Sequence, residues 1–175
     1  MKQYKRVTGI VISKKDLFNG DRSISVLTET GFILNLYAKG IAKSLNREII
    51  SFDICSVSEF LYSNSIVTKS SLIKTFKFKN IKEYRQAFYM LKIINSIKYY
   101  DFHSKSIFLS LQNSLLSIGK NEEKSIISQF IISILESHGI MMDNLKKATI
   151  RELERHMFDH LDVYVNYETF MNYLS

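Results

Sequence analysis

The chain has 175 residues, of which 46% are hydrophobic and 23% charged, with a net charge of +7. This composition is ordinary for a globular protein and excludes wholesale disorder, while the length allows one large domain or two small ones. A single cysteine, Cys55, excludes an internal disulfide framework and a zinc site built on several cysteines.

The first half of the chain begins with a strand and a hairpin. Residues 7–13 are a β-branched run, and residues 21–37 predict two strands joined by a turn at Gly31. Glycine at this position allows the positive φ that a tight hairpin needs. Alternation then puts Ile24 and Val26 on one face of the first hairpin strand.

Two more strands follow a segment without clear periodicity. Residues 40–50 predict a loop or a single helical turn, residues 53–62 alternate like a strand that includes Cys55, and residues 66–78 predict a strand bent at Ser70. Five short strands without intervening helices favour a small closed or nearly closed barrel over about residues 1–79.

From Asn80 onward the periodicity is that of helices. Asn80 with Glu83, and Thr149 with Glu152, match the capping-box pattern. The apolar residues of the first predicted helix form a stripe that we expect to be buried. The third predicted helix is apolar on most sides, so we expect it at the centre of a bundle. The predicted caps are Asn80, Asn121, Thr149 and Asn166. The stripe of the first helix comprises Tyr84, Ala87, Phe88, Leu91 and Ile94. The other helices are expected at 104–118, 122–138, 149–161 and after Asn166.

No segment predicts secretion or a membrane span. The most apolar window, residues 125–142, is interrupted by Gln129, Glu136 and His138, so it predicts a buried helix. The charged start of the chain lacks the apolar stretch of a signal peptide. We therefore expect a soluble, cytoplasmic protein.

The motifs of catalysis and metal binding are weak. The sequence contains no glycine-rich phosphate loop and no Gly-x-Ser-x-Gly elbow, so we expect no enzymatic activity and no cofactor. His156 and His160 are four positions apart, which is half of a zinc site. Without a third ligand nearby, a structural role is the favoured interpretation.

All the excess positive charge lies in the first half. Residues 1–80 contain 13 lysines and arginines against 6 acidic residues, whereas residues 81–175 contain 11 of each. Such a distribution favours an anionic partner, although a basic run is often only a solvated face. The candidate nucleic-acid-binding residues flank the central hairpin: Lys14, Lys15, Arg22, Tyr37, Lys39, Lys43 and Arg47.

Two aromatic residues accompany these cations. Tyr37 and Phe18 would stack on bases if exposed, as in single-strand binders. Alternatively, each ring fills the interior of the barrel. The sequence leaves both interpretations open.

The order of residues resembles that of the RecO family of bacterial recombination mediators. The most specific stretch is Ala38-Lys39-Gly40, followed by Ser44. The other similar segments are Gly9-Ile-Val-Ile-Ser, Asp21-Arg, the Leu-Thr-Glu-x-Gly turn, Leu61-Tyr62, the helix from Tyr84, Ile134 to Leu145, and Phe158 to Leu161.

The resemblance implies an α+β protein of two domains: an oligonucleotide-binding (OB) barrel over residues 1–79 and an all-helical bundle for protein contacts over residues 80–175. It implies binding of single- and double-stranded DNA and strand annealing in recombinational repair. It further implies action with RecR and the C-terminal tail of single-stranded-DNA-binding protein to load RecA, in the bacterial cytoplasm at the nucleoid. An OB-fold protein-interaction scaffold that does not bind nucleic acid is the alternative.

The sequence also departs from the family pattern. Many members carry a four-cysteine zinc module after the segment ending at Leu145, whereas this chain continues almost directly to Thr149, so it would be a short form without that module. The loop after Gly40 is Ile-Ala-Lys, less basic than usual, which predicts weaker DNA binding. A usual proline near residues 50–52 is absent.

Overall fold

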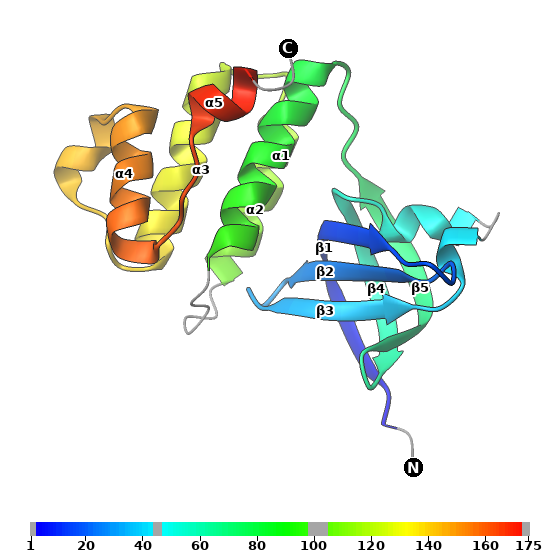
Figure 1. Cartoon of the computed structure of the whole chain (residues 1–175). Helices are drawn as coiled ribbons and strands as arrows, with labels where there is room; N and C mark the ends of the chain where they lie inside the picture. Colours follow the sequence, from blue (N-terminus) through cyan, green and yellow to red (C-terminus); the bar gives the residue numbers. More distant parts are fainter. Residues whose placement is uncertain (1–2, 44–46, 98–104, 173–175) are drawn as a thin grey trace. The chain divides into compact units, whose positions relative to one another are not determined.

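The computed structural model describes residues 3–43, 47–97 and 105–172 (Figure 1). The chain divides into two compact units, Met1–Phe76 and Lys77–Ser175, and each is described by itself. Five strands precede the helices, so the expected α+β class, with an N-terminal sheet followed by helices, is confirmed.

The strands of the first unit form one closed sheet in the order β1-β2-β3-β5-β4, with β4 paired back to β1. The strand pairs are antiparallel except for β3 and β5, which are parallel and joined at the single pair Tyr37–Ile66. The strands are β1 (Lys5–Asp16), β2 (Arg22–Thr28), β3 (Ile33–Ala38), β4 (Ser56–Ser63) and β5 (Ile66–Thr75).

The interior of this sheet is apolar because alternate residues of each strand point inward. Ile24 and Val26 lie on one face of β2, as predicted, and this face is in the core opposite Leu36 and Leu34 of β3. Phe60 of β4 is completely buried. The fully buried members of this core are Val11, Ile24, Val26, Leu36, Ala38, Phe52 and Phe60.

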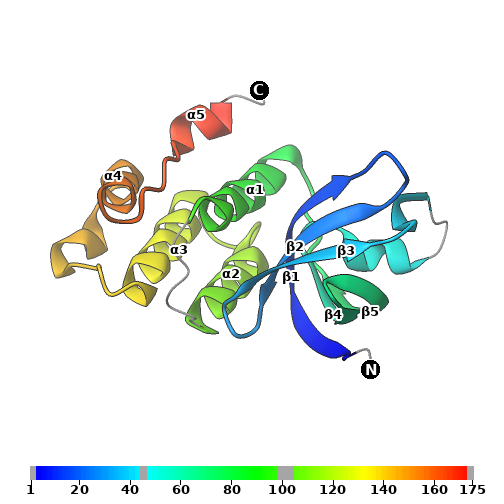
Figure 2. The same ribbon diagram turned by 60° about the horizontal axis from the view of Figure 1, so that its bottom comes forward.

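Short 3-10 helices occupy the connection between β3 and β4. They are η1 (Ile41–Lys43) and η2 (Arg47–Phe52), where the sequence predicts a loop or helical turn. η2 packs against β4 and β5. Both views of the ribbon show these turns at the end of the sheet that carries the β1–β2 loop (Figure 2).

The strand predicted over residues 53–62 starts later than expected. β4 begins at Ser56 because Cys55 adopts a left-handed backbone conformation, with φ of 62°. Cys55 is therefore not part of the strand, and its burial raises the pKa of the thiol to about 12. The fifth strand ends at Thr75 rather than at residue 78, and register shifts occur on both sides of Ser70.

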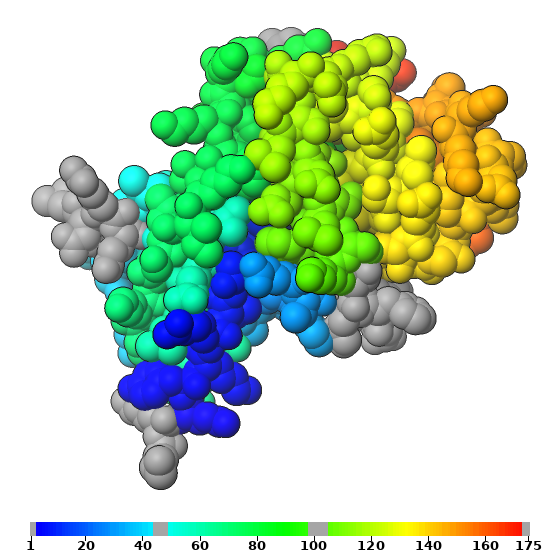
Figure 3. Space-filling view, turned by 180° about the vertical axis from the view of Figure 1, so that it is seen from behind, coloured from blue at the N-terminus to red at the C-terminus, as the bar shows by residue number. Residues whose placement is uncertain are grey.

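The described part of the second unit is helical. α2 and α3 pack side by side, as the face in Figure 3 shows. As expected for a helix that is apolar on most sides, α3 buries Ile126, Ile127, Phe130, Ile131, Ile134 and Leu135. The helices are α1 (Ile81–Ser96), α2 (Lys105–Ser117), α3 (Glu123–Ser137), η3 (Asp143–Lys147), α4 (Ile150–Leu161) and α5 (Tyr167–Asn172). Among the described residues, no helix is both long and apolar enough to cross a membrane.

Three of the predicted caps are confirmed and one is wrong. The side chain of Asn80 accepts a hydrogen bond from the backbone amide of Glu83, and that of Asn166 accepts one from the amide of Thr169. Thr149 forms a complete capping box with Glu152. The fourth prediction, Asn121, fails because α3 starts after Glu122, whose side chain makes no capping bond.

The predicted buried stripe of α1 is partly wrong. Tyr84 and Phe88 are exposed, at 46% and 40% of their reference areas. The buried face instead includes Gln86, Tyr89 and Met90, together with the predicted Ala87, Leu91 and Ile94. The helix has apolar residues on more than one side, so its periodicity does not identify the buried side.

Candidate nucleic-acid interface

Strand pairing brings the basic segments of the first unit to one end of the sheet. Asp16 at the end of β1 lies opposite Arg22 at the start of β2, and Arg22 lies opposite Ala38 at the end of β3. The amide of Tyr37 donates to the carbonyl of Ser65 at 2.8 Å, which brings in the β4–β5 turn. We call this end, with the β1–β2 loop and the exit from β3, the loop end.

The loop end is braced by one buried carboxylate, that of Asp21. It accepts hydrogen bonds from the backbone amide of Gly40 at 2.7 Å and the side-chain amide of Asn19 at 2.7 Å, and from the hydroxyl of Tyr37. The bond from Gly40 is the main cause that lowers the pKa of Asp21, and Lys39 adds a smaller electrostatic contribution. Asp21 thus connects the β1–β2 loop to the Ala-Lys-Gly turn.

Arg22 is buried, contrary to its expected place on the binding surface. Its Nε donates to Asp16 at 2.6 Å, and Nη1 lies 3.7 Å from Asp53. Lys14 Nζ donates to the same Asp53 carboxylate at 2.7 Å. Arg22 lowers the pKa of Asp16 through its hydrogen bond. Two of the candidate cations therefore neutralise acidic residues of the protein itself.

Lys15, Lys39 and Lys43 are exposed and form no ion pair with the described residues. Lys15 lies opposite Ser23 in the sheet and shares the outward face with Tyr37. A Cβ atom at Gly20 would lie 2.7 Å from the Lys43 side-chain carbons, so the stem of Lys43 passes directly over that glycine. Arg47 begins η2, but its side chain lies outside the described part of the structure.

The two aromatic candidates have different environments. Tyr37 is half-buried and its hydroxyl is bonded to Asp21, which raises the pKa of the phenol. It does not fill the interior, because it alternates with the buried Leu36 and Ala38. Phe18, at the tip of the β1–β2 loop, is fully exposed.

A polar row crosses the outward face of the sheet beside these residues. The hydroxyl of Ser13 donates to Ser25 at 2.9 Å, and that of Ser25 donates to the Asn35 side-chain oxygen at 2.8 Å. The sequence alone does not predict this row. Alternation places Asn35 on the Tyr37 face, but the serines come from strands whose register only the folded sheet reveals.

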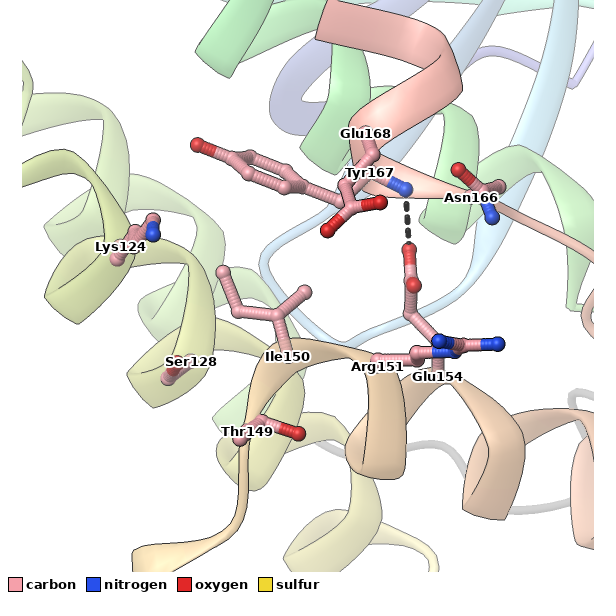
Figure 4. A pocket seen from close by; sticks show the side chains of 9 residues that line it. All are labelled: Lys124, Ser128, Thr149, Ile150, Arg151, Glu154, Asn166, Tyr167 and Glu168. Atoms are coloured by element: carbon pink, nitrogen blue, oxygen red, sulfur yellow. Dashed lines mark hydrogen bonds between the residues drawn. The ribbon is translucent and has the colours of Figure 1, made fainter.

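The helical unit contains a pocket of about 580 Å³ between α3, α4 and α5 (Figure 4). Glu154 lines the pocket and accepts a hydrogen bond from the backbone amide of Tyr167, drawn as the dashed line. It accepts a second hydrogen bond from the hydroxyl of Tyr89. Burial is the main cause that raises the pKa of Glu154. Lys124 and Arg151 also line the pocket. No sequence motif predicts these residues as a group.

No candidate metal centre is formed by the described residues: none of their histidine, cysteine and carboxylate side chains gather in groups of three or more. The ring centroids of His156 and His160 are 4.3 Å apart with their planes tilted by 57°, and His156 Nε2 is 2.8 Å from the Ile140 carbonyl oxygen. His156 thus connects α4 to the preceding segment, whereas His160 is exposed.

The first unit is thus a small five-stranded sheet whose loop end exposes lysines and one aromatic ring. The chain is 37% identical over 62 residues to the DNA repair protein RecO of Leptospira biflexa serovar Patoc, in both the Ames and the Paris strains of Patoc 1. The matched stretch covers 35% of this chain and only 25% of the relative. No family model matches the chain.

Proposed function

We propose that this chain is a RecO-like protein of recombinational DNA repair whose first unit is an OB fold that binds DNA, chiefly single-stranded. The observation that carries the proposal is the set of exposed lysines, Lys15, Lys39 and Lys43, on the braced loop end. OB folds bind oligonucleotides on strands 2 and 3 and on the loops after strands 1 and 4. The strand order and the partial likeness to RecO support this assignment.

Binding would be mainly electrostatic. Each lysine that neutralises a phosphate releases a condensed counterion, so affinity falls as salt rises. The nearby acidic side chains repel phosphates only weakly, because Asp16 and Asp53 are already paired with Arg22 and Lys14. The polar row through Ser25 and Asn35 offers hydrogen bonds to sugars and phosphates.

In the cell, the proposed role is to anneal complementary strands and to act with RecR and single-stranded-DNA-binding protein in loading RecA, without enzymatic turnover. The second unit would make the protein contacts in the cytoplasm at the nucleoid, and the short segment between Leu145 and Thr149 would hold no zinc module.

The competing function is a protein-interaction scaffold whose basic charge is incidental. Titration of a fluorescent single-stranded oligonucleotide at about 50 mM and about 200 mM salt separates the two. A DNA-binding protein gives saturable binding that weakens steeply with salt. Absence of binding at the lower salt concentration would favour the scaffold.

A further inference from the structure

We infer that Phe18 is a base-stacking residue that gives the loop end its preference for single-stranded nucleic acid. This inference rests on the proposed function, because it assigns a role within the same interface. An exposed aromatic ring alone is common on protein surfaces. Three features of its surroundings distinguish Phe18.

The first feature is full exposure at a corner of a tight turn. Phe18 has 110% of its reference accessible area, so its ring packs against none of the residues that the structure describes. The Gly20 amide donates to the Leu17 carbonyl at 3.0 Å, which makes Phe18 the second residue of a four-residue turn. A ring held away from the core in this way contributes nothing to folding that would explain it.

The second feature is the rigidity of the loop that carries the ring. The Leu17 amide donates to the Asp21 carbonyl at 2.9 Å, and the Asn19 side chain bonds to both the carboxylate and the amide of Asp21. The Ala42 amide donates to the Gly20 carbonyl at 2.9 Å. The backbone is therefore ordered before any ligand arrives, which reduces the entropy lost on binding.

The third feature is the presence of two lysines on the segments that flank Phe18. Lys15 precedes Phe18 on β1, and the stem of Lys43 lies over Gly20, two residues after Phe18. Single-strand binders combine a cationic surface that contacts phosphates with an aromatic ring on which a base stacks. Bases of a duplex are already stacked on one another, so the ring favours single strands.

The chain contains no tryptophan, which allows a direct test. In the full-length Phe18→Trp variant, stacking on a base should quench the fluorescence of the single indole when an oligothymidine is added. Phe32→Trp is the matched control, because Phe32 is a half-exposed phenylalanine at the opposite end of β2, beyond Thr28. Its fluorescence should change little.

Affinity supplies the second readout. Phe18→Ala should weaken binding of single strands by about 5-fold to about 150-fold, the equivalent of roughly 1–3 kcal/mol. Duplex affinity and the slope of affinity against salt should stay close to the wild-type values, because no charge is removed.

The outcomes separate this inference from the proposed function. If wild-type protein binds single strands but Phe18→Trp is not quenched and Phe18→Ala binds as tightly as wild type, the stacking role is wrong and DNA binding stands. If wild-type protein binds no DNA at low salt, both are wrong. Equal losses for single strands and duplex in Phe18→Ala would also overturn the inference.

Discussion

The Asp21 carboxylate accepts the backbone amide hydrogen of Gly40 at 2.7 Å, across 19 positions of the chain. This hydrogen bond joins the start of β2 to the exit from β3. Through this bond, the aspartate holds the turn that displays Lys39.

Substitution of Asp21 should loosen the loop end and lower stability. Asp21→Ala removes the acceptor for Gly40, Asn19 and Tyr37, whereas Tyr37→Phe removes only one of these bonds. The melting temperature should therefore fall more in Asp21→Ala than in Tyr37→Phe. Thermal unfolding followed by circular dichroism measures this order, and the reverse order would contradict the bracing role.

The same hydrogen bond predicts that the stability of the folded protein depends on pH in the acid range. The pKa of Asp21 is lowered in the folded state, first by the Gly40 amide. Its stabilising contribution is therefore present above the ordinary aspartate pKa and is lost as the pH falls through the lower folded value. Asp21→Asn should flatten the acid limb of the stability curve, whereas Asp159→Asn, at an exposed position of α4, should leave it unchanged.

In the helical unit, Glu154 predicts a pH dependence of stability opposite in sign to that of Asp21. Burial raises its pKa, so its favourable contribution is present at low pH and decreases as the pH rises through the folded pKa. Glu154→Gln keeps an acceptor for Tyr89 and Tyr167 without the charge, so its stability should vary less with pH. Urea unfolding between about pH 4 and about pH 8 measures this; identical pH profiles would rule it out.

A second change at this position tests the hydrogen bonds themselves. Glu154→Leu leaves the buried Tyr89 hydroxyl without its carboxylate acceptor, which costs about 1–3 kcal/mol. The loss should appear in the free energy of unfolding at acid pH, where the wild-type side chain is most favourable. Equal stability of the leucine and glutamine variants there would show that these bonds contribute nothing.

Gly9 is predicted to tolerate no side chain. A Cβ atom there would lie 2.4 Å from Val26 Cγ1 and 2.5 Å from the Leu27 carbonyl oxygen, and the latter is fixed in the sheet. Gly9→Ala should therefore destabilise the first unit by about 1–3 kcal/mol. Thr8→Ala, at the neighbouring half-buried position, is the control for a change in the same strand, and chemical denaturation compares the two.

Much of the fold is predictable from local patterns. Alternation correctly puts Ile24 and Val26 on one face of β2, and the caps at Asn80 and Thr149 mark helix starts correctly, because these signals depend on neighbours in the chain. Alternation wrongly puts Cys55 in a strand, because the left-handed backbone at this residue does not interrupt the alternation in the sequence. Tyr84 shows that apolar periodicity fails when a helix has several apolar sides.

The candidate site is predictable only in part, for a related reason. The sequence identifies Lys39 and Lys43 because they are close in the chain to the hairpin. It cannot separate them from Arg22, which is buried and approaches the distant Asp53 only in the folded chain. The polar row through Ser25 likewise depends on strand register, which is set by tertiary pairing.

The most direct test of the central claim is the salt dependence of single-strand binding in a Lys39→Glu, Lys43→Glu double variant. A matched variant, Lys105→Glu with Lys120→Glu, changes the same total charge at exposed lysines of the helical unit. Single-strand affinity should fall, and the slope of log affinity against log salt should decrease by about 0.7 for each phosphate that the variant no longer neutralises. The matched variant should keep the wild-type slope. Unchanged affinity and slope in the Lys39, Lys43 variant would contradict the proposed DNA interface.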